Sequence, residues 1–235
     1  MMFEEMEEEK REQGKTEKTG GVLYPDAGEH IPTQMLHEAS AAYGADAADP
    51  RQGHYTINDY YAIPEDRRVE LIDGWIYDMG APTNLHQLLI GELYLQLVPC
   101  AAEHPGCEIF FAPCDVRLNN DDLTVVQPDL LIVCKGQDQD VRRINGAPDF
   151  IVEVLSPSSR YHDMFRKLNI YKDAGVREYW IIDPDKQKTT VYRFEEDTLP
   201  ETYTFSDQVE LGISEGRCTV DFTKVYARIS RYLVP

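Results

Sequence analysis

The stretch PDFIVEVLSPSSRYHDMFRKLNIYKDAGVREYWIIDP, from Pro148 to Pro184, decides the fold. It begins with a short apolar strand, FIVEVL, turns at SPSS, and ends in a second apolar strand, REYWIID. Between them, apolar residues at helical spacing predict a helix that Gly175 stops. The pattern predicts a sheet with a helix folded back over it; the helix turns Phe165, Leu168 and Tyr171 toward that sheet.

One acidic residue, Glu153, interrupts the first apolar run. A carboxylate inside a buried strand is unfavourable unless another group pairs with it. Two partners fit the sequence. One is a metal ion shared with a second carboxylate, and the other is a buried ion pair with Arg160 or Lys167.

The flanking sequence adds further elements around this unit. Thr56 and Asp59 resemble a capping box, Asp73-Gly74 predicts a hairpin, and Thr83 caps an amphipathic helix over TNLHQLLIGELYLQLVPCAAEH. We therefore expect an α/β (α+β) fold with a mixed central β-sheet flanked by helices and extra strands at both ends. The other predicted strands are CEIFFAPCDVRL, TVVQPDLLIVC, TTVYRF, ETYTF, QVELGI and CTVDF, and the segment KGQDQDVRRINGA is expected to be a charged loop.

Charge and apolar content divide the chain into two parts. The 235 residues contain 23 Lys and Arg against 42 Asp and Glu, a formal net charge of −19, and 42% are hydrophobic. Residues 1–50 alternate charge blocks with small residues, so they are expected to form an acidic, largely disordered tail that folding does not need, with at most a short helix near Ile31–Tyr43. Residues 51–235 are expected to form a single domain.

The cysteines and the N-terminus predict a cytoplasmic protein. Five cysteines are present, and no two have the C-x-x-C spacing of a zinc site. We expect ordinary thiols in a reducing compartment and no disulfide framework. The sequence has no apolar run long enough to span a membrane and no signal peptide.

Asp129 and Glu153 are the candidate metal ligands. Asp129 lies in the strand segment VVQPDLLIV, and the two carboxylates converge if the two strands pair. Converging carboxylates repel each other and need a cation between them, and oxygen ligands suit Mg²⁺ or Mn²⁺. The alternative is that Asp129 is an ordinary solvated strand residue.

Lys167 is the candidate cation, because the predicted helix brings it back over the sheet. It shares a helix face with Asp163 and Tyr171, each four residues away. A helix lysine at the surface is the alternative interpretation.

Several motifs together resemble the Uma-two family of putative restriction endonucleases, which belongs to the PD-(D/E)XK nuclease superfamily. The resemblance covers about residues 55 to 200. It rests on VELIDG before the hairpin, APTNLHQLLIGEL, QPDLLIV, APDFIVEVLSPSS, D-x-x-x-K-x-x-x-Y and GVREYWIIDP. It implies a restriction-endonuclease-like core of helix, three strands, helix and strand.

The resemblance also implies roles for individual residues. Asp129 and Glu153 match the metal-binding acids, and Lys167 matches a lysine that has migrated from the position of Leu155 to the helix. Glu70 and His86 match further site residues. His86 could be an acid, a base or an outer hydrogen-bond donor, or simply a surface or core histidine. Glu92 is a weaker candidate, and Trp75 departs from the glutamate that the family usually has.

Two functions follow. The first is a Mg²⁺- or Mn²⁺-dependent endonuclease that hydrolyses nucleic acid, DNA by preference; the second is an inert nuclease-fold module that binds or assists. The acidic composition favours the second, because phosphate binding needs basic residues. A homodimer is expected only because such nucleases often pair to cut two strands. The basic rim that a nuclease needs could come from Arg142, Arg143, Arg160, Arg166, Lys167, Lys172 and Arg177.

Overall fold

The computed structural model describes residues 49–119, 121–134, 138–139, 142–156, 166–196 and 198–233. Except for its last two residues, the expected N-terminal tail lies outside this part, as do the possible helix near Ile31–Tyr43 and the positions of Arg160, Asp163 and Phe165. The disorder of the tail and the domain boundary near residue 50 therefore stay predictions.

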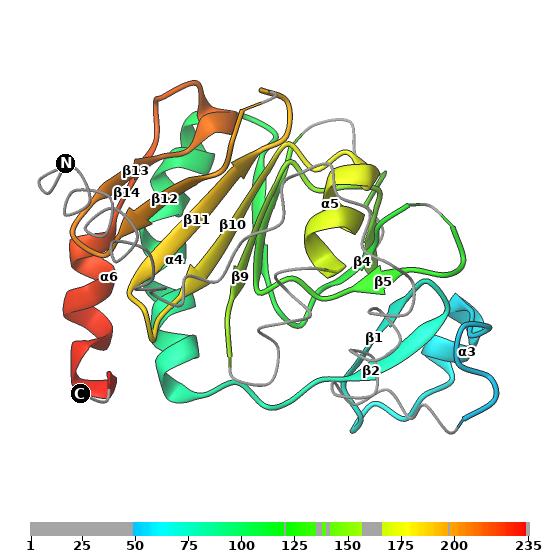
Figure 1. Ribbon diagram of the computed structural model, residues 1–235. Helices are drawn as coiled ribbons and strands as arrows, with labels where there is room; N and C mark the ends of the chain where they lie inside the picture. Colours follow the sequence, from blue (N-terminus) through cyan, green and yellow to red (C-terminus); the bar gives the residue numbers. More distant parts are fainter. Residues whose placement is uncertain are drawn as a thin grey trace, which may run out of the picture. The chain divides into compact units, whose positions relative to one another are not determined.

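A six-stranded mixed sheet forms the centre of the described fold, which confirms the expected fold class (Figure 1). Its order is β12-β11-β10-β9-β6-β3, with β9 and β10 parallel and the other neighbours antiparallel. The strands are β3 (Glu108–Phe111), β6 (Leu130–Val133), β9 (Phe150–Val154), β10 (Glu178–Asp183), β11 (Lys188–Arg193) and β12 (Glu201–Thr204).

Helices cover both faces of this sheet (Figure 1). The predicted amphipathic helix is α4 (Asn84–Glu103), and the Thr83 side chain accepts the His86 N–H at 3.2 Å as its N-cap. It packs with α6 (Phe222–Ile229) on one face, against Val152 and Val154. The predicted return helix is α5 (Leu168–Ala174), which packs on the other face and ends at Gly175 with φ 94°.

A second six-stranded sheet has the order β2-β1-β5-β4-β8-β7. The predicted strands CEIFFAPCDVRL and TVVQPDLLIVC are each divided between the two sheets. Strands β3 and β6 join the central sheet, whereas β4 and β5 join the second. Helix α3 (Ile57–Tyr61) packs on β1, β2 and β5. The strands are β1 (Val69–Ile72), β2 (Trp75–Asp78), β4 (Asp115–Arg117), β5 (Val125–Val126), β7 (Asp138–Gln139) and β8 (Arg143–Asn145).

The hairpin between β1 and β2 turns at Asp73-Gly74, as predicted. Both residues have positive φ, 51° and 77°, the pattern of a tight hairpin turn. A Cβ at Gly74 would lie 2.7 Å from the Gly53 carbonyl oxygen, so the turn needs glycine for space as well as for conformation.

Three features differ from the sequence-based expectation. The supposed charged loop contains β7 and β8. The segments QVELGI and CTVDF form a separate ribbon of β13 (Gln208–Glu210) and β14 (Thr219–Asp221), with the 3₁₀ turn η2 (Gly212–Ser214) between them. Helix α6, followed by the turn η3 (Ser230–Tyr232), was not predicted, although Asp221 caps it and Phe222, Val225 and Ile229 are apolar at helical spacing.

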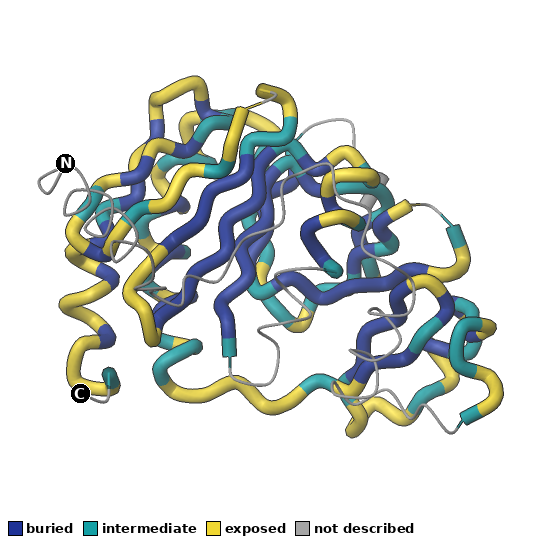
Figure 2. The backbone as a smooth tube through the Cα atoms, in the orientation of Figure 1, coloured by how far each residue is buried: buried dark blue, intermediate teal, exposed yellow. Residues whose placement is uncertain are grey.

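Strand β9 is buried on both faces, as the dark tube in Figure 2 shows. Phe150, Val152 and Val154 point toward α4 and α6, whereas Ile151 points toward α5. Because side chains alternate along a strand, Glu153 points toward α5 as well. Its partner must therefore come from that face or from the end of the sheet.

The expectation of free thiols is wrong for four of the five cysteines. Cys100 at the end of α4 is disulfide-bonded to Cys218, and Cys107 is bonded to Cys134 at the end of β6. Cys114 is the free cysteine. The sequence could not indicate these pairs. The cysteines of the two bridges are separated by 118 and 27 positions, and they come together only in the folded chain.

Reduction is expected to lower the stability of the domain. Each disulfide restricts the unfolded chain, so losing one should reduce the free energy of unfolding by about 2–5 kcal/mol. Urea unfolding with and without a phosphine reductant measures this change. Alkylation in denaturant should label one cysteine before reduction and all five after it. Labelling of all five without reductant would contradict the two pairs, and Cys114→Ser should leave the response to reductant unchanged.

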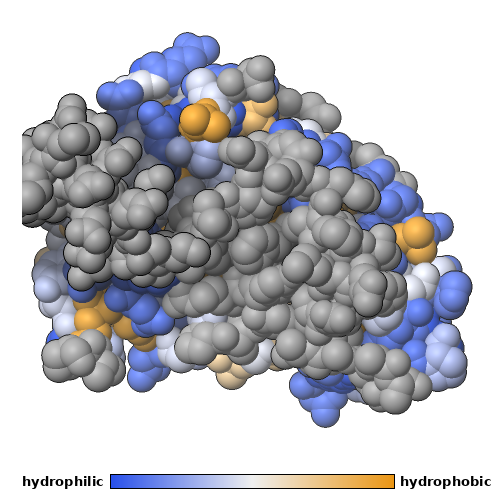
Figure 3. Space-filling view, in the orientation of Figure 1, coloured by the Kyte–Doolittle hydropathy of each residue, from blue (hydrophilic) through white to orange (hydrophobic). Residues whose placement is uncertain are grey.

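The described surface is mostly hydrophilic on the face shown in Figure 3, and its hydrophobic residues form small separate patches. Within the described ranges, no helix is both long and apolar enough to cross a membrane.

Candidate active site

The segment Gln127-Pro128-Asp129 connects the two sheets. It follows β5 of the second sheet and leads directly into β6 of the central sheet. The side chain of Gln127 contacts residues of the second sheet and α3, whereas Asp129 contacts β9 and α4. This short connection therefore links the two halves of the candidate site.

Asp129 and Glu153 are neighbours across two strands. Leu130 pairs with Val152, so the antiparallel register places Asp129 opposite Glu153. The backbone N–H of Val154 donates to Asp129 Oδ2 at 2.8 Å and fixes the carboxylate at the strand end. The structure thus brings the two predicted metal ligands to adjacent positions.

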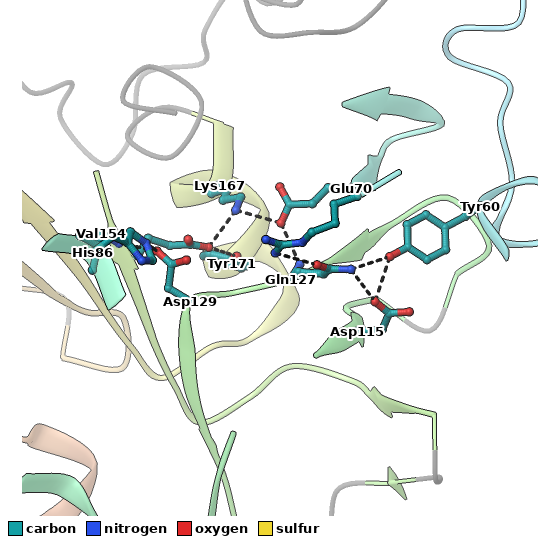
Figure 4. A network of polar contacts seen from close by, with 11 residues as sticks. Tyr60, Glu70, His86, Asp115, Gln127, Asp129, Val154, Lys167 and Tyr171 are labelled. Carbon is teal, nitrogen blue, oxygen red and sulfur yellow. Dashed lines mark hydrogen bonds and ion pairs between the residues drawn. The ribbon is translucent and has the colours of Figure 1, made fainter. Parts of the chain in front are cut away.

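Lys167 lies between two buried carboxylates (Figure 4). Its ammonium nitrogen is 2.9 Å from Glu153 Oε1 and 3.0 Å from Glu70 Oε1. The three side chains are only 3–4% exposed. Lys167 immediately precedes α5 and has helical backbone angles, so the return of this helix over the sheet brings its side chain to Glu153. The ion pair that the sequence left as an alternative is therefore present.

Two neutral donors also contact these carboxylates. The Tyr171 hydroxyl donates to Glu153 Oε1 at 2.7 Å, and the Gln127 backbone N–H donates to Glu70 Oε1 at 2.8 Å. Tyr171 follows Lys167 by four residues and shares its helix face. Burial, together with the charge of Glu153, holds the pKa of Tyr171 well above its usual value, so the phenol remains a donor. Such added hydrogen bonds are what make buried charges tolerable.

His86 holds Asp129 from α4. Its Nε2 atom is 2.9 Å from Asp129 Oδ2, and the two side chains are 14% and 15% exposed. The buried Nδ1 atom has no hydrogen-bond partner among the described residues. A proton on Nδ1 would be a buried donor without a partner among the described residues, so Nε2 is the ring nitrogen placed to donate to Asp129. Of the roles open to His86, an outer donor fits this arrangement better than a base.

Glu92 and Trp75 contact other residues. Glu92 accepts a hydrogen bond from Gln96 one turn further along α4, at 3.3 Å. The Trp75 ring faces Gly53, where a Cβ would lie 3.2 Å from its Nε1. These contacts give Glu92 no support as a site residue.

A polar network that the sequence did not reveal continues from Glu70 to α3 (Figure 4). The Gln127 side chain joins Arg68, Tyr60 and Asp115. The only sequence signal was the position of Gln127 directly before Pro128-Asp129. Its partners lie 12 to 67 residues away, so no local pattern indicates them.

The oxygen donors at this site fit a hard divalent cation. No cluster of three or more His, Cys, Asp and Glu side chains in the described part of the chain could hold a metal. Mg²⁺ instead usually keeps several waters and binds one or two carboxylates, which Asp129 and Glu153 supply. The Val154 N–H and the His86 imidazole both contact Oδ2 of Asp129. The pair therefore suits a hard divalent cation rather than a closed zinc site.

Several arginines expected to form the basic rim contact acidic or aromatic side chains of the fold. Arg177 pairs with Asp149 at 3.4 Å and with Glu195 at 3.0 Å. Arg143 and Arg166 stack over the rings of Tyr61 and Tyr77, at 5.4 and 4.8 Å from the ring centroids. Arg160 lies outside the described residues.

Comparison with known proteins points to one family. Residues 57–217 match the family model Uma2, described as "Putative restriction endonuclease". The chain is 27% identical over 146 residues to "Uncharacterized protein slr1290" of Synechocystis sp., covering 60% of this chain and 75% of that protein. A crystal structure of "a putative nuclease belonging to DUF820" from Anabaena variabilis superposes with a TM-score of 0.59 and 18% identity, covering 74% of this chain and 98% of that one. At this identity, the structural match shows similarity of fold alone.

Proposed function

Because the chain belongs to the Uma2 family of putative restriction endonucleases, we propose that it is a divalent-metal-dependent phosphodiesterase of the nuclease type. The observation that carries the proposal is the adjacency of Asp129, Glu153 and Lys167 at one end of the central sheet. The three residues come from the position before β6, from β9 and from the position before α5, and their proximity supports a shared role. DNA as the preferred substrate and a homodimeric state remain predictions from the family resemblance.

Each residue has a role that its contacts support. Asp129 and Glu153 would hold Mg²⁺ or Mn²⁺, which when bound supplies an activated water and stabilises negative charge on a phosphoryl group. Lys167 and Tyr171 orient the Glu153 carboxylate through Oε1, while His86 and the Val154 N–H orient Asp129. Glu70 fixes the Lys167 ammonium from the other side.

The alternative is a nuclease fold that binds nucleic acid or a partner without cleaving it. Two observations favour it. Lys167 is in contact with two carboxylates and is 3% exposed, as in a purely structural ion pair. The chain also has a net charge of −19, which disfavours contact with phosphates.

A cleavage assay with a matched variant tests the proposal. We expect the 235-residue protein to cleave supercoiled plasmid, single-stranded DNA or RNA when Mg²⁺ or Mn²⁺ is present, and not after chelation. Glu153→Gln keeps an oxygen for Lys167 and Tyr171 but loses a negative ligand, so cleavage should fall by about 100-fold or more. Cleavage that survives both chelation and this variant would contradict the assignment. Binding without cleavage would favour the inert module.

A further inference from the structure

The side chain of Gln127 is held by hydrogen bonds to three other side chains. Its Oε1 accepts from Arg68 Nη2 at 3.2 Å, and its Nε2 donates to Tyr60 OH at 3.1 Å and to Asp115 Oδ1 at 3.0 Å. The Tyr60 hydroxyl also donates to Asp115 Oδ1 at 2.9 Å. The residue is only 8% exposed, so both ends of the amide are used in the interior.

The backbone of the same residue contacts the candidate site. The Gln127 N–H donates to Glu70 Oε1, the oxygen that also contacts the Lys167 ammonium. Two residues further on, beyond the rigid Pro128, lies Asp129. Gln127 therefore contacts Glu70, which holds Lys167, and lies two residues before Asp129, a candidate metal ligand.

We propose that Gln127 is a positioning residue for this site, an inference that rests on the proposed function. Its side chain anchors the connection between the sheets to α3, β1 and β4. Its backbone N–H then holds Glu70, and Glu70 holds the Lys167 ammonium against Glu153. The network acts through the position of Lys167 and Asp129, and Gln127 itself touches no substrate.

The chemistry of the anchor requires an amide. Arg68 needs an acceptor and Asp115 needs a donor, and glutamine presents one of each. A carboxylate in the same place would lie about 3 Å from Asp115 and repel it. Burial and the nearby Asp115 raise the pKa of Tyr60 far above its usual value, so the phenol stays neutral and leaves the two carboxylates without a compensating charge.

The first test compares two glutamine variants. Gln127→Leu is expected to release Glu70, and the slowly exchanging ammonium signal of Lys167 in ¹H–¹⁵N NMR, identified by its loss in Lys167→Met, should disappear. Gln96→Leu is the matched control, because Gln96 bridges Asp221 through two hydrogen bonds of 3.2 and 2.8 Å in a separate part of the fold. It should lower stability but preserve the signal. An unchanged Lys167 signal in Gln127→Leu would overturn the proposal.

Kinetics give a second measurement. Misplacement of reacting groups by about 1 Å can reduce a rate by about 100-fold, so Gln127→Leu should lower kcat by at least about tenfold with little change in KM. The NMR result does not depend on cleavage. A lost ammonium signal in a protein that cleaves nothing would support the anchor and reject the proposed function, while a normal kcat would reject the anchor.

The last test changes the charge of the anchor. In Gln127→Glu, the new carboxyl group faces Tyr60 on α3, Asp115 on β4 and Arg68 next to β1, and a carboxylate in this position repels Asp115. The variant should therefore lose activity relative to wild type. Adding Asp115→Asn should restore activity, because the asparagine amide can donate to the new carboxylate. Full activity in Gln127→Glu, or no rescue in the double variant, would contradict the proposed anchoring.

Discussion

Lys167→Met is expected to abolish cleavage and to destabilise the fold at the same time. Cleavage should decrease by about 100-fold or more, the scale for removing one charge-stabilising group. The free energy of unfolding should fall by about 3–5 kcal/mol, because removing one partner of a buried ion pair leaves uncompensated charge. Urea unfolding and plasmid cleavage measure the two effects independently.

The large stability effect follows from the burial of three charged groups. Without the ammonium, Glu70 and Glu153 would lose the cation that lies between them, and the Gln127 N–H and the Tyr171 hydroxyl are neutral donors that cannot replace its charge. Each carboxylate is only 3–4% exposed, so water cannot replace the lost cation without opening the structure. Methionine fills the space of the lysine stem, so lost packing contributes little.

Two controls separate catalysis from stability. Lys167→Met combined with Glu153→Gln removes one of the two buried charges and should recover much of the stability but no activity. Lys224→Met on α6 replaces an exposed lysine, with a side chain 64% exposed, and should change neither quantity. A stable and active Lys167→Met variant would show that the lysine has neither a catalytic nor a structural role.

The residues of the candidate site differ in how far the sequence could predict them. Glu153 was visible because an acid inside an apolar strand needs a partner, and Lys167 because the helix after that strand must return over the sheet. Asp129 was visible at a strand end within a recognisable motif. These predictions use only local pattern and short connections, which a single sequence contains.

The missed features depend on contacts between distant segments. The role proposed for Gln127 depends on its hydrogen bond to Tyr60, 67 residues away. It also depends on the position of Gln127 between β5 and β6, which belong to different sheets. The disulfides join segments that only the folded chain brings together. Helix α6 is an exception, because its cap and apolar spacing were present in the sequence but followed a strand-like segment so closely that the boundary was not recognised.

Asp129→Asn is expected to abolish divalent-cation binding while leaving the fold intact. Asparagine keeps an oxygen that can accept from the Val154 N–H, so the free energy of unfolding should change by about 1 kcal/mol or less. It loses the negative charge that Mg²⁺ or Mn²⁺ requires, so cleavage should fall by at least about 100-fold. Calorimetric titration with Mn²⁺ and urea unfolding measure the two properties on the same sample.

The chain contains a close structural match to this residue. Asp149 also follows a proline and directly precedes a strand, accepts a backbone N–H from Cys134 at 2.7 Å, and has a side chain that is 15% exposed, as is that of Asp129. Because β6 and β9 are antiparallel, the two aspartates lie at opposite ends of the strand pair. Asp149→Asn should therefore preserve Mn²⁺ binding and cleavage while losing a similar amount of stability. If the two variants kept equal Mn²⁺ affinity, the assignment of Asp129 would be wrong; if only Asp149→Asn lost it, the site would lie at the other end of the sheet, beside Arg177.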